Sequence, residues 1–345
     1  MGRGDFTGKN HLVLFVLVMV VLLSPSFSVA LQESTVKGAR DEGTVVIYGS
    51  TQITQMNPLI DRFKSKYPFL NVRYFRGGSE KLVERIQMEA RAGSYFVDVS
   101  VLRQATMLPL KERGLLGRYE SPARKWVRDI HKDGEGYWTG LYSNMEWVGY
   151  NTKLVPPAEA PRKHDDLLHP KWKGKMGLDP VADAEWYMSQ LHILGKEKGR
   201  IFMRQLAKQD IQFRRGHSLL AQLLAAGEFP LILTLRDSTA FELIKKGAPI
   251  DWVAFEPVIP LPAQVLVIGK NAPHPNSARL FADYALSREG QEVLKSLGRN
   301  STRLDVEPES ERVKRLKIGK IDWPSYLQRY NQYAEEFNQL FLKGN

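Results

Sequence analysis

Short polar runs follow several apolar segments of this chain, and their side chains are suited to binding a small anion. Hydroxyl groups and glycine N–H groups at the start of a helix can hold an anionic group, and a guanidinium offers a bidentate fork to a carboxylate or a phosphate. The candidate residues in these runs are Ser50, Thr51, Gly78, Ser79, Trp186, Tyr187, Arg236 and Asp237. Arg236 is the strongest of them, because it stands where a predicted strand ends and a helix begins.

Most of these candidates also have a purely structural interpretation, and the sequence leaves both interpretations open. Gly78 can supply a tight turn, and Ser79 can cap a helix. Trp186 and Tyr187 can belong to a hydrophobic core. Arg236 can pair with a neighbouring acid on the surface of a lobe.

The sequence contains no pattern that supports catalysis or metal binding. It has no cysteine and seven histidines, and no two histidines have the spacing of an H-x-x-x-H or H-E-x-x-H motif. A G-x-S-x-G motif is also missing. We therefore predict a binding protein without enzymatic activity, cofactor or metal site.

The segments that position the candidate residues alternate between strands and helices. Continuous apolar runs, typical of strands buried on both faces of a sheet, occupy Thr44–Tyr48, Leu231–Leu235 and Val265–Ile268. Asn57 and Pro58 predict the start of a helix. This alternation predicts an α/β fold with two lobes, each a mainly parallel sheet flanked by helices.

The alternation is interrupted and then resumes, which indicates that one unit is inserted into another. Residues 31–43 are polar and predict a flexible lead-in. The first lobe is predicted over 41–117 and 259–300, and the second over 118–258. Residues 301–345 are predicted to form a helical segment that packs on the lobes. Ligands of open α/β sheets bind beyond the carboxyl ends of the strands, where the candidate residues stand.

The N-terminus has the features of a secretory signal. Arg3 and Lys9 precede a largely apolar run, His11–Leu23, and small residues precede a predicted cleavage site after Ala30. Residues 1–30 are therefore predicted to be a signal peptide that directs the mature chain to the periplasm.

The basic residues that give the chain a formal net charge of +11 are scattered along it. A nucleic-acid-binding protein would gather them on one face with interleaved aromatic residues, so we predict no nucleic-acid partner. The scatter is typical of a solvated surface, and a second interpretation is long-range attraction of small anions.

Several segments together resemble the periplasmic solute-binding proteins of ABC importers, in the ferric-type and 2-aminoethylphosphonate-type family with the type II periplasmic-binding fold. The segments that carry the resemblance are Leu167–Lys175, Ala225–Pro230, Lys245–Asp251, Lys270–Ala278 and Leu286–Gln291. The resemblance implies a monomer that captures a small solute between two hinged lobes. It also implies delivery of that solute to an inner-membrane ABC permease.

The sequence departs from the iron-binding members of this family at one position. Those members have adjacent tyrosines just after the strand that follows the Gly-Glu turn, whereas this chain has Leu235, Arg236 and Asp237 there. Phenolate oxygens suit the hard cation Fe(III), and an arginine repels it. A small organic anion is therefore the first choice of solute. Ferric ion, held by phenolates such as those of Tyr48, Tyr142 and Tyr187, is the alternative, and a periplasmic enzyme or a sensor module on the same fold is less favoured.

Overall fold

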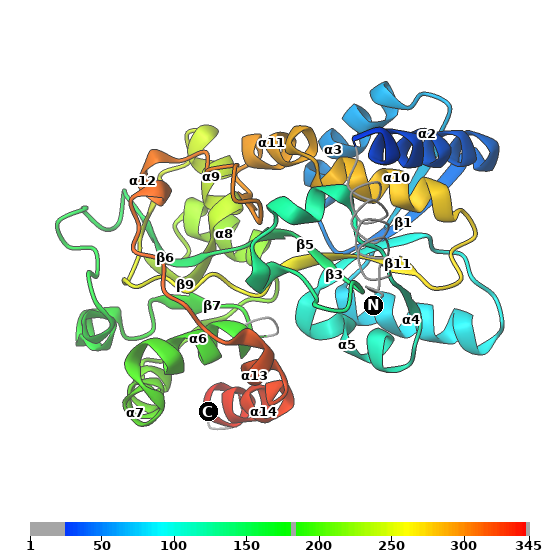
Figure 1. Ribbon diagram of the computed structural model, residues 1–345. Coiled ribbons are helices and arrows are strands. Elements are labelled where there is room, and N and C mark those ends of the chain that lie inside the picture. Colours follow the sequence, from blue (N-terminus) through cyan, green and yellow to red (C-terminus); the bar gives the residue numbers. More distant parts are fainter. Residues whose placement is uncertain (1–24, 181–183, 343–345) are drawn as a thin grey trace, which may run out of the picture.

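The computed structural model describes residues 25–180 and 184–342 of the chain. These residues form two sheets, each flanked by helices, and the resulting lobes lie side by side (Figure 1). The predicted two-lobed α/β fold is confirmed. Among the described residues, no helix combines the length and the apolar composition that crossing a membrane requires.

The first lobe is built on a seven-stranded sheet of the described residues, in the order β12-β5-β11-β3-β1-β2 with β4 beside β11. The strands are β1 Thr44–Gly49, β2 Asn71–Arg76, β3 Val99–Arg103, β4 Leu116–Gly117, β5 Thr139–Ser143, β11 Gln264–Gly269 and β12 Asn300–Ser301. Strands β1, β2 and β3 are parallel, whereas β11 runs antiparallel to both β3 and β5. The carboxyl ends of β1, β2 and β3 therefore meet at one edge of the sheet.

Helices cover both faces of this sheet, because apolar side chains alternate between its two faces. Val101 belongs to one core and Leu102 to the other. The helices on the Val101 face are α2 Pro25–Glu42, α3 Ile53–Lys66, α10 Pro275–Leu286 and α11 Arg288–Ser296. Those on the Leu102 face are α4 Ser79–Arg91 and α5 Gln104–Glu112.

The second lobe has a five-stranded sheet of the described residues, in the order β10-β6-β9-β7-β8. Its strands are β6 Glu146–Asn151, β7 Met176–Leu178, β8 Gln212–Phe213, β9 Leu231–Arg236 and β10 Ile250–Val253. Its helices are α6 Ala184–Leu194, α7 Lys196–Ala207, α8 His217–Ala226 and α9 Asp237–Lys245. The C-terminal segment adds α12 Glu311–Lys314, α13 Trp323–Leu327 and α14 Tyr330–Phe341. Helix α14 buries Tyr333, Phe337 and Phe341 in the same core as α6 and α7.

Strand β5 lies in a different lobe from the one that the sequence predicted. That division placed 118–258 in the second lobe, but β5 pairs with β11 in the first sheet. The chain passes to the second lobe only between Ser143 and Glu146, where β5 ends and β6 begins. The aperiodic sequence that precedes β5 gave no signal of this pairing, because its partner β11 lies more than a hundred residues later.

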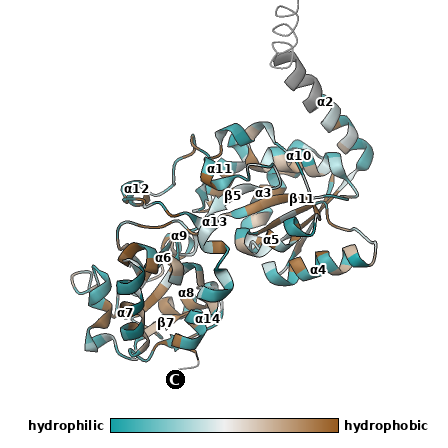
Figure 2. Ribbon diagram, turned by 60° about the horizontal axis from the view of Figure 1, so that its bottom comes forward, coloured by the Kyte–Doolittle hydropathy of each residue, from teal (hydrophilic) through white to brown (hydrophobic). Residues whose placement is uncertain are grey.

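The segment 31–43, predicted as a flexible lead-in, is helical up to Glu42 as part of α2, which extends from the first lobe in Figure 2. The helix is held because Ala39 is fully buried against α10 and because Glu42 accepts hydrogen bonds from the backbone N–H groups of Asn276 and Ser277. Residues 1–24 of the predicted signal peptide lie outside the described residues, and 25–30 form the start of α2.

Helix α3 begins at Ile53, one turn before the start predicted at Asn57, and Pro58 lies inside it. Proline costs one helical hydrogen bond, but Leu59, Ile60 and Phe63 bury their side chains on the same helix. The earlier start brings the first turn of α3 to the edge where β1 ends.

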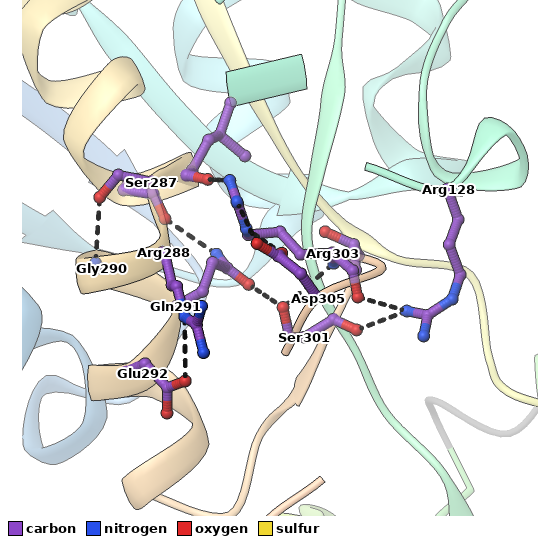
Figure 3. A network of polar contacts seen from close by, with 12 residues as sticks. Arg128, Ser287, Arg288, Gly290, Gln291, Glu292, Ser301, Arg303 and Asp305 are labelled. Atoms are coloured by element: carbon purple, nitrogen blue, oxygen red, sulfur yellow. Dashed lines mark hydrogen bonds and ion pairs between the residues drawn. The ribbon is translucent and has the colours of Figure 1, made fainter. Parts of the chain in front are cut away.

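Polar contacts fix the segment that follows β12 to the first lobe (Figure 3). Arg303 is almost completely buried, and its guanidinium donates to both carboxylate oxygens of Asp305 and to the carbonyl of Leu286. Ser301 donates to Gln291 at 2.6 Å, and Arg128 donates to the carbonyls of Ser301 and Arg303. These contacts hold the backbone on one side of Arg299, a residue of the cleft described next.

Candidate ligand site

A cleft of about 640 Å³ lies between the two lobes, within the range of roughly 300 to 1,000 Å³ typical of small-molecule sites. The first lobe contributes residues that follow β1, β2 and β3, and the second contributes residues that follow β7, β8 and β9. Carboxyl ends of strands from both sheets thus border the same space, as expected for open α/β sheets.

Five described helices begin at this cleft, namely α3, α4, α5, α8 and α9. The residues that precede them are Gln52, Gly78, Arg103, Gly216 and Arg236, and none makes a side-chain capping hydrogen bond. A helix N-terminus carries unsatisfied N–H groups and a partial positive charge. The backbone around the cleft therefore favours an anion.

Basic side chains outnumber acidic ones in the lining. The basic residues are Arg76, Arg103, Arg215, Arg236, Lys246 and Arg299, and the acidic ones are Glu80, Asp179 and Glu242. Glu80 pairs with Arg103, and Glu242 pairs with Lys246 at 2.6 Å. Arg76, Arg215 and Arg299 have no carboxylate within ion-pair distance in the part of the chain that the structure describes.

Arg299 is the most deeply placed of these cations, with 8% of its surface exposed. Its guanidinium donates to the side-chain oxygens of Gln55 and Asn144 and lies 4.4 Å from the centre of the Tyr142 ring. Its Nε has no partner among the described residues. Since all of these partners are neutral and a buried charge is costly without a counter-charge, Arg299 provides a strong site for an anionic group.

Arg236 lines the same cleft but is paired with a buried carboxylate. Its Nε donates to Glu146 Oε1 at 3.2 Å, and the side chain of Glu146 is only 2% exposed. Burial raises the pKa of Glu146 to about 7, although Arg236 acts in the opposite direction. Arg236 is therefore paired with an acid, as the structural interpretation expects, and it also lines the cleft.

Arg103 connects the two lobes across the cleft. It follows β3 in the first lobe and pairs there with Glu80, and its Nη1 lies 3.6 Å from Glu185 Oε2 on α6 of the second lobe. Ser79 Oγ accepts a hydrogen bond from the Arg103 backbone N–H at 3.1 Å. This part of the cleft is thus held by contacts from both sides.

Five of the eight predicted site residues line the cleft: Ser50, Thr51, Gly78, Ser79 and Arg236. Ser50 Oγ donates to Gln264 at 3.1 Å, and the Thr51 hydroxyl lies 2.7 Å from the Tyr142 hydroxyl. The structure brings these residues together from three strand ends, which is the arrangement that the sequence predicted. Their contact with a solute stays a prediction.

Trp186, Tyr187 and Asp237 lie outside the cleft lining. Trp186 and Tyr187 belong to the core of the second lobe, where the Tyr187 hydroxyl donates to Glu336 of α14 at 3.3 Å. Asp237 is buried and accepts hydrogen bonds from the Met145 backbone N–H and the Asn300 side chain. Burial raises the pKa of Asp237 to about 6, with the Arg299 charge acting against that shift.

Sequence reasoning missed several residues of the cleft, among them Gln55, Arg76, Arg103 and Arg299. Arg76 and Arg103 each end a strand, so the rule that selected Arg236 could have found them. Arg299 follows helix α11, and only the pairing of β12 with β5 carries it to the cleft.

The described residues contain no cluster of three or more histidine, aspartate or glutamate side chains that could hold a metal ion. The hydroxyls of Tyr48 and Tyr187 donate to Glu89 and Glu336 away from the cleft lining. Burial raises the pKa of each of these tyrosines to about 12. Of the three tyrosines considered for ferric ion, only Tyr142 lines the cleft.

Comparisons with known proteins agree with this architecture. A family model for "Bacterial extracellular solute-binding protein" matches residues 44–300. An Fe(3+)-binding periplasmic protein of Serratia marcescens is 23% identical over 293 residues, which cover 80% of this chain and 82% of that protein.

Two solved structures show the same fold. Iron-bound HitA from Pseudomonas aeruginosa matches with a TM-score of 0.75 and 20% identity, over 87% of this chain and 99% of HitA. AfuA from Actinobacillus pleuropneumoniae, with fructose-6-phosphate bound, matches with a TM-score of 0.73 and 23% identity, over 87% of this chain and 98% of AfuA. The predicted type II periplasmic-binding fold is confirmed.

Proposed function

This chain belongs to the bacterial extracellular solute-binding proteins, and we propose that its solute is a small organic anion held in the cleft between the lobes. The observation that carries the proposal is Arg299, a largely buried guanidinium that lines the cleft and has only neutral partners. An anionic group of the solute would supply a counter-charge within ion-pair distance, which the more distant buried Asp237 does not provide. The class of solute is a phosphate ester, a phosphonate or a carboxylate.

The cleft offers such a solute contacts from both lobes. Arg76 and the N-termini of α3 and α4 stand on the first-lobe side, and Arg215 with the N-terminus of α8 stands on the second. Interactions that form only when both sides approach would favour a closed state when solute binds. Hinge closure around the solute is therefore part of the proposal.

The proposal also includes a location and a partner. The family is extracellular, and the Serratia marcescens relative is a periplasmic protein by its name. A structure with the same fold is titled as the substrate-binding protein of an ABC transporter from Agrobacterium tumefaciens. We place this protein in the periplasm, as a monomer without catalytic activity that delivers its solute to an inner-membrane ABC permease.

Ferric ion is the second candidate solute, because the Serratia marcescens relative is an Fe(3+)-binding protein and HitA is iron-bound. The cleft chemistry argues against it. Three arginines without carboxylate partners would repel Fe(III), and Tyr142 is the one tyrosine in the described lining. A ferric site would need additional oxygen ligands, from a small anion or from solvent.

Native mass spectrometry of freshly purified protein, followed by thermal unfolding with added solutes, tests the proposal. The panel contains phosphate esters, phosphonates, carboxylates and ferric citrate. We expect an organic anion to raise the melting temperature by roughly 5 °C at a hundred times its Kd. The shift should be lost in Arg299→Gln and kept in Arg204→Gln, a matched arginine change on the exposed face of α7. A bound iron atom, or stabilisation by ferric citrate alone, would overturn the proposal.

A further inference from the structure

Glu146 is a buried carboxylate behind the cleft lining, where it lies beside Arg236 and His217. It opens strand β6, its side chain is 2% exposed, and Oε1 accepts from Arg236 Nε at 3.2 Å. Oε2 is buried and has no hydrogen-bond partner among the described residues. Arg236 has 22% of its side chain exposed and lines the cleft. A charge placed in the cleft beside Arg236 therefore acts on Glu146 at short range.

Charged and titratable groups face Glu146 from every element around it. Arg236 comes from β9, His217 from α8, Glu185 from α6 and Asp237 from α9. His217 Nε2 lies 3.8 Å from Glu146 and 3.8 Å from Asp179, and the charge of Arg103 also acts on His217. Arg236, His217, Glu185 and Asp237 thus act on one poorly solvated carboxyl group, while Arg103 and Asp179 act on its neighbour His217.

The balance of these effects leaves Glu146 as the group that exchanges a proton near neutral pH. Burial raises the pKa of Glu146 to about 7, and the charges of Glu185 and Asp237 act in the same direction, while Arg236 opposes them. Burial and the charges of Arg236 and Arg103 hold the pKa of His217 well below its usual value. His217 therefore stays neutral where Glu146 titrates.

We propose that Glu146 is a positioning residue for Arg236 and that its protonated fraction rises, with proton uptake from solvent, when an anionic solute binds. The inference rests on the proposed function, since it requires an anion in the cleft. An anion beside Arg236 competes with Glu146 for the guanidinium and adds a like charge, so the ionised form of Glu146 becomes less favourable. Conversely, a protonated Glu146 no longer neutralises Arg236, so the positive charge of Arg236 attracts the solute more strongly.

This linkage is reciprocal, so it predicts how affinity changes with pH. Near pH 7 about half of the Glu146 side chains in the free protein would be protonated, and binding would take up roughly half a proton. Affinity for an anion should then fall about threefold for each pH unit between 6.5 and 8.5. Asp237, whose pKa burial raises to about 6, is mostly ionised across this range and contributes little.

Carbon-13 NMR of glutamate-labelled protein, titrated from pH 5 to 9 with and without saturating sodium sulfate, tests the proposal. Sulfate is chosen because it stays dianionic over this range. We expect one glutamate signal with a midpoint near 7 that moves up by more than one pH unit in sulfate, as the predicted change of affinity with pH requires. That signal should vanish in Glu146→Gln. It should remain in Glu89→Gln, a matched change in a glutamate that Arg85 and Tyr48 bind away from the cleft.

The pH profile of sulfate affinity separates proton uptake from a merely structural role. Glutamine keeps the size of Glu146 and an oxygen for Arg236, so Glu146→Gln should bind sulfate equally well at pH 6.5 and 8.5. Wild type and Glu89→Gln should weaken over that range. A Glu146 midpoint below 5, or sulfate that stabilises the protein without moving the midpoint, overturns the inference and leaves the proposed function standing. Sulfate that neither stabilises the protein nor moves the midpoint also overturns the inference, whereas the proposed function is judged separately by the panel of organic solutes.

Discussion

Two arginines border the same cleft, but their surroundings differ. Arg299, in the segment between α11 and β12, lies against two amides and an aromatic ring. Arg236, at the end of β9, lies against the buried carboxylate of Glu146. The charge of Arg299 is open to a solute, whereas that of Arg236 is largely neutralised while Glu146 is ionised. The availability of an arginine therefore depends on the charge of its neighbours more than on its place at a strand end.

The same contrast extends to the two sides of the cleft. The side formed by Ser50, Thr51, Gln55, Asn144 and Arg299 presents hydroxyls and amides, and Arg299 has no carboxylate within ion-pair distance among the described residues. The second-lobe side covers a group of buried acids, which includes Glu146, Glu185 and Asp237. One side is thus suited to hold the anionic group of a solute, and the other to adjust the strength of that binding through its protonation.

The largest effect is expected from Arg299→Gln. Loss of the buried guanidinium should weaken binding of an organic anion about 100-fold, or roughly 2.7 kcal/mol. Isothermal titration calorimetry with the solute identified by native mass spectrometry measures this change. Arg299→Lys keeps the charge without the fork and should bind with intermediate affinity. An unchanged Kd in Arg299→Gln would place the anion elsewhere in the cleft.

Glu146→Gln should change the pH dependence of stability. Because burial raises the pKa of Glu146 from 4.5 to about 7, the folded state holds more protons than the unfolded state between those values. Stability therefore falls as pH rises through this window. Glutamine removes the effect, so the variant should be more stable than wild type by about 3 kcal/mol at pH 8 and by little at pH 4.5. Urea unfolding at the two pH values measures the difference.

The matched variant Glu89→Gln should show no such gain at pH 8. If Glu146→Gln is less stable than wild type at pH 8 as well as at pH 4.5, the pair with Arg236 stabilises the fold and the comparison of the two arginines fails. If the gain is present but Arg236 contributes as much to solute affinity as Arg299 does, Glu146 does not neutralise Arg236. The electrostatic explanation of the difference between the two arginines then fails.

A smaller effect is expected from Tyr187→Phe, which tests whether this predicted site residue belongs to the core. The change removes the hydrogen bond to Glu336 on α14 and should cost about 1 kcal/mol of stability. Solute affinity should stay the same, because Tyr187 lies in the core beneath α14 and not in the cleft lining. A tenfold loss of solute affinity in Tyr187→Phe with unchanged stability would instead show that Tyr187 contacts the solute.

The sequence predicted the two-lobed fold and most of the first-lobe side of the cleft, because those features follow from local patterns. Ser50, Thr51, Gly78 and Ser79 come directly after apolar strands, and the carboxyl ends of β1 and β2 meet because these strands are parallel. A strand followed by a polar turn is visible in a few residues of sequence.

The features that the sequence could not show depend on contacts between distant segments. Trp186 and Tyr187 follow a strand like the other candidates, but α14 covers them from about 150 residues away. Arg299 reaches the cleft only because β12 pairs with β5. Glu146 gives no local sign of its burial against Arg236, since that contact joins the start of β6 to the end of β9.

The smallest effect is expected from Arg236→Gln at pH 8, although Arg236 was the strongest candidate in the sequence. Removal of this guanidinium leaves Glu146 buried without its main counter-charge, so Glu146 should take up a proton and remain neutral. The net charge beside the cleft then changes little, and anion affinity should fall only about threefold, or less than 1 kcal/mol.

At pH 6 Glu146 is mostly protonated already in wild type, so the loss in Arg236→Gln should grow to about tenfold. Calorimetry of both proteins at the two pH values measures these losses. A loss that is equal at pH 6 and pH 8, and as large as that of Arg299→Gln, would show that Glu146 does not govern Arg236 and that both arginines bind the solute in the same way.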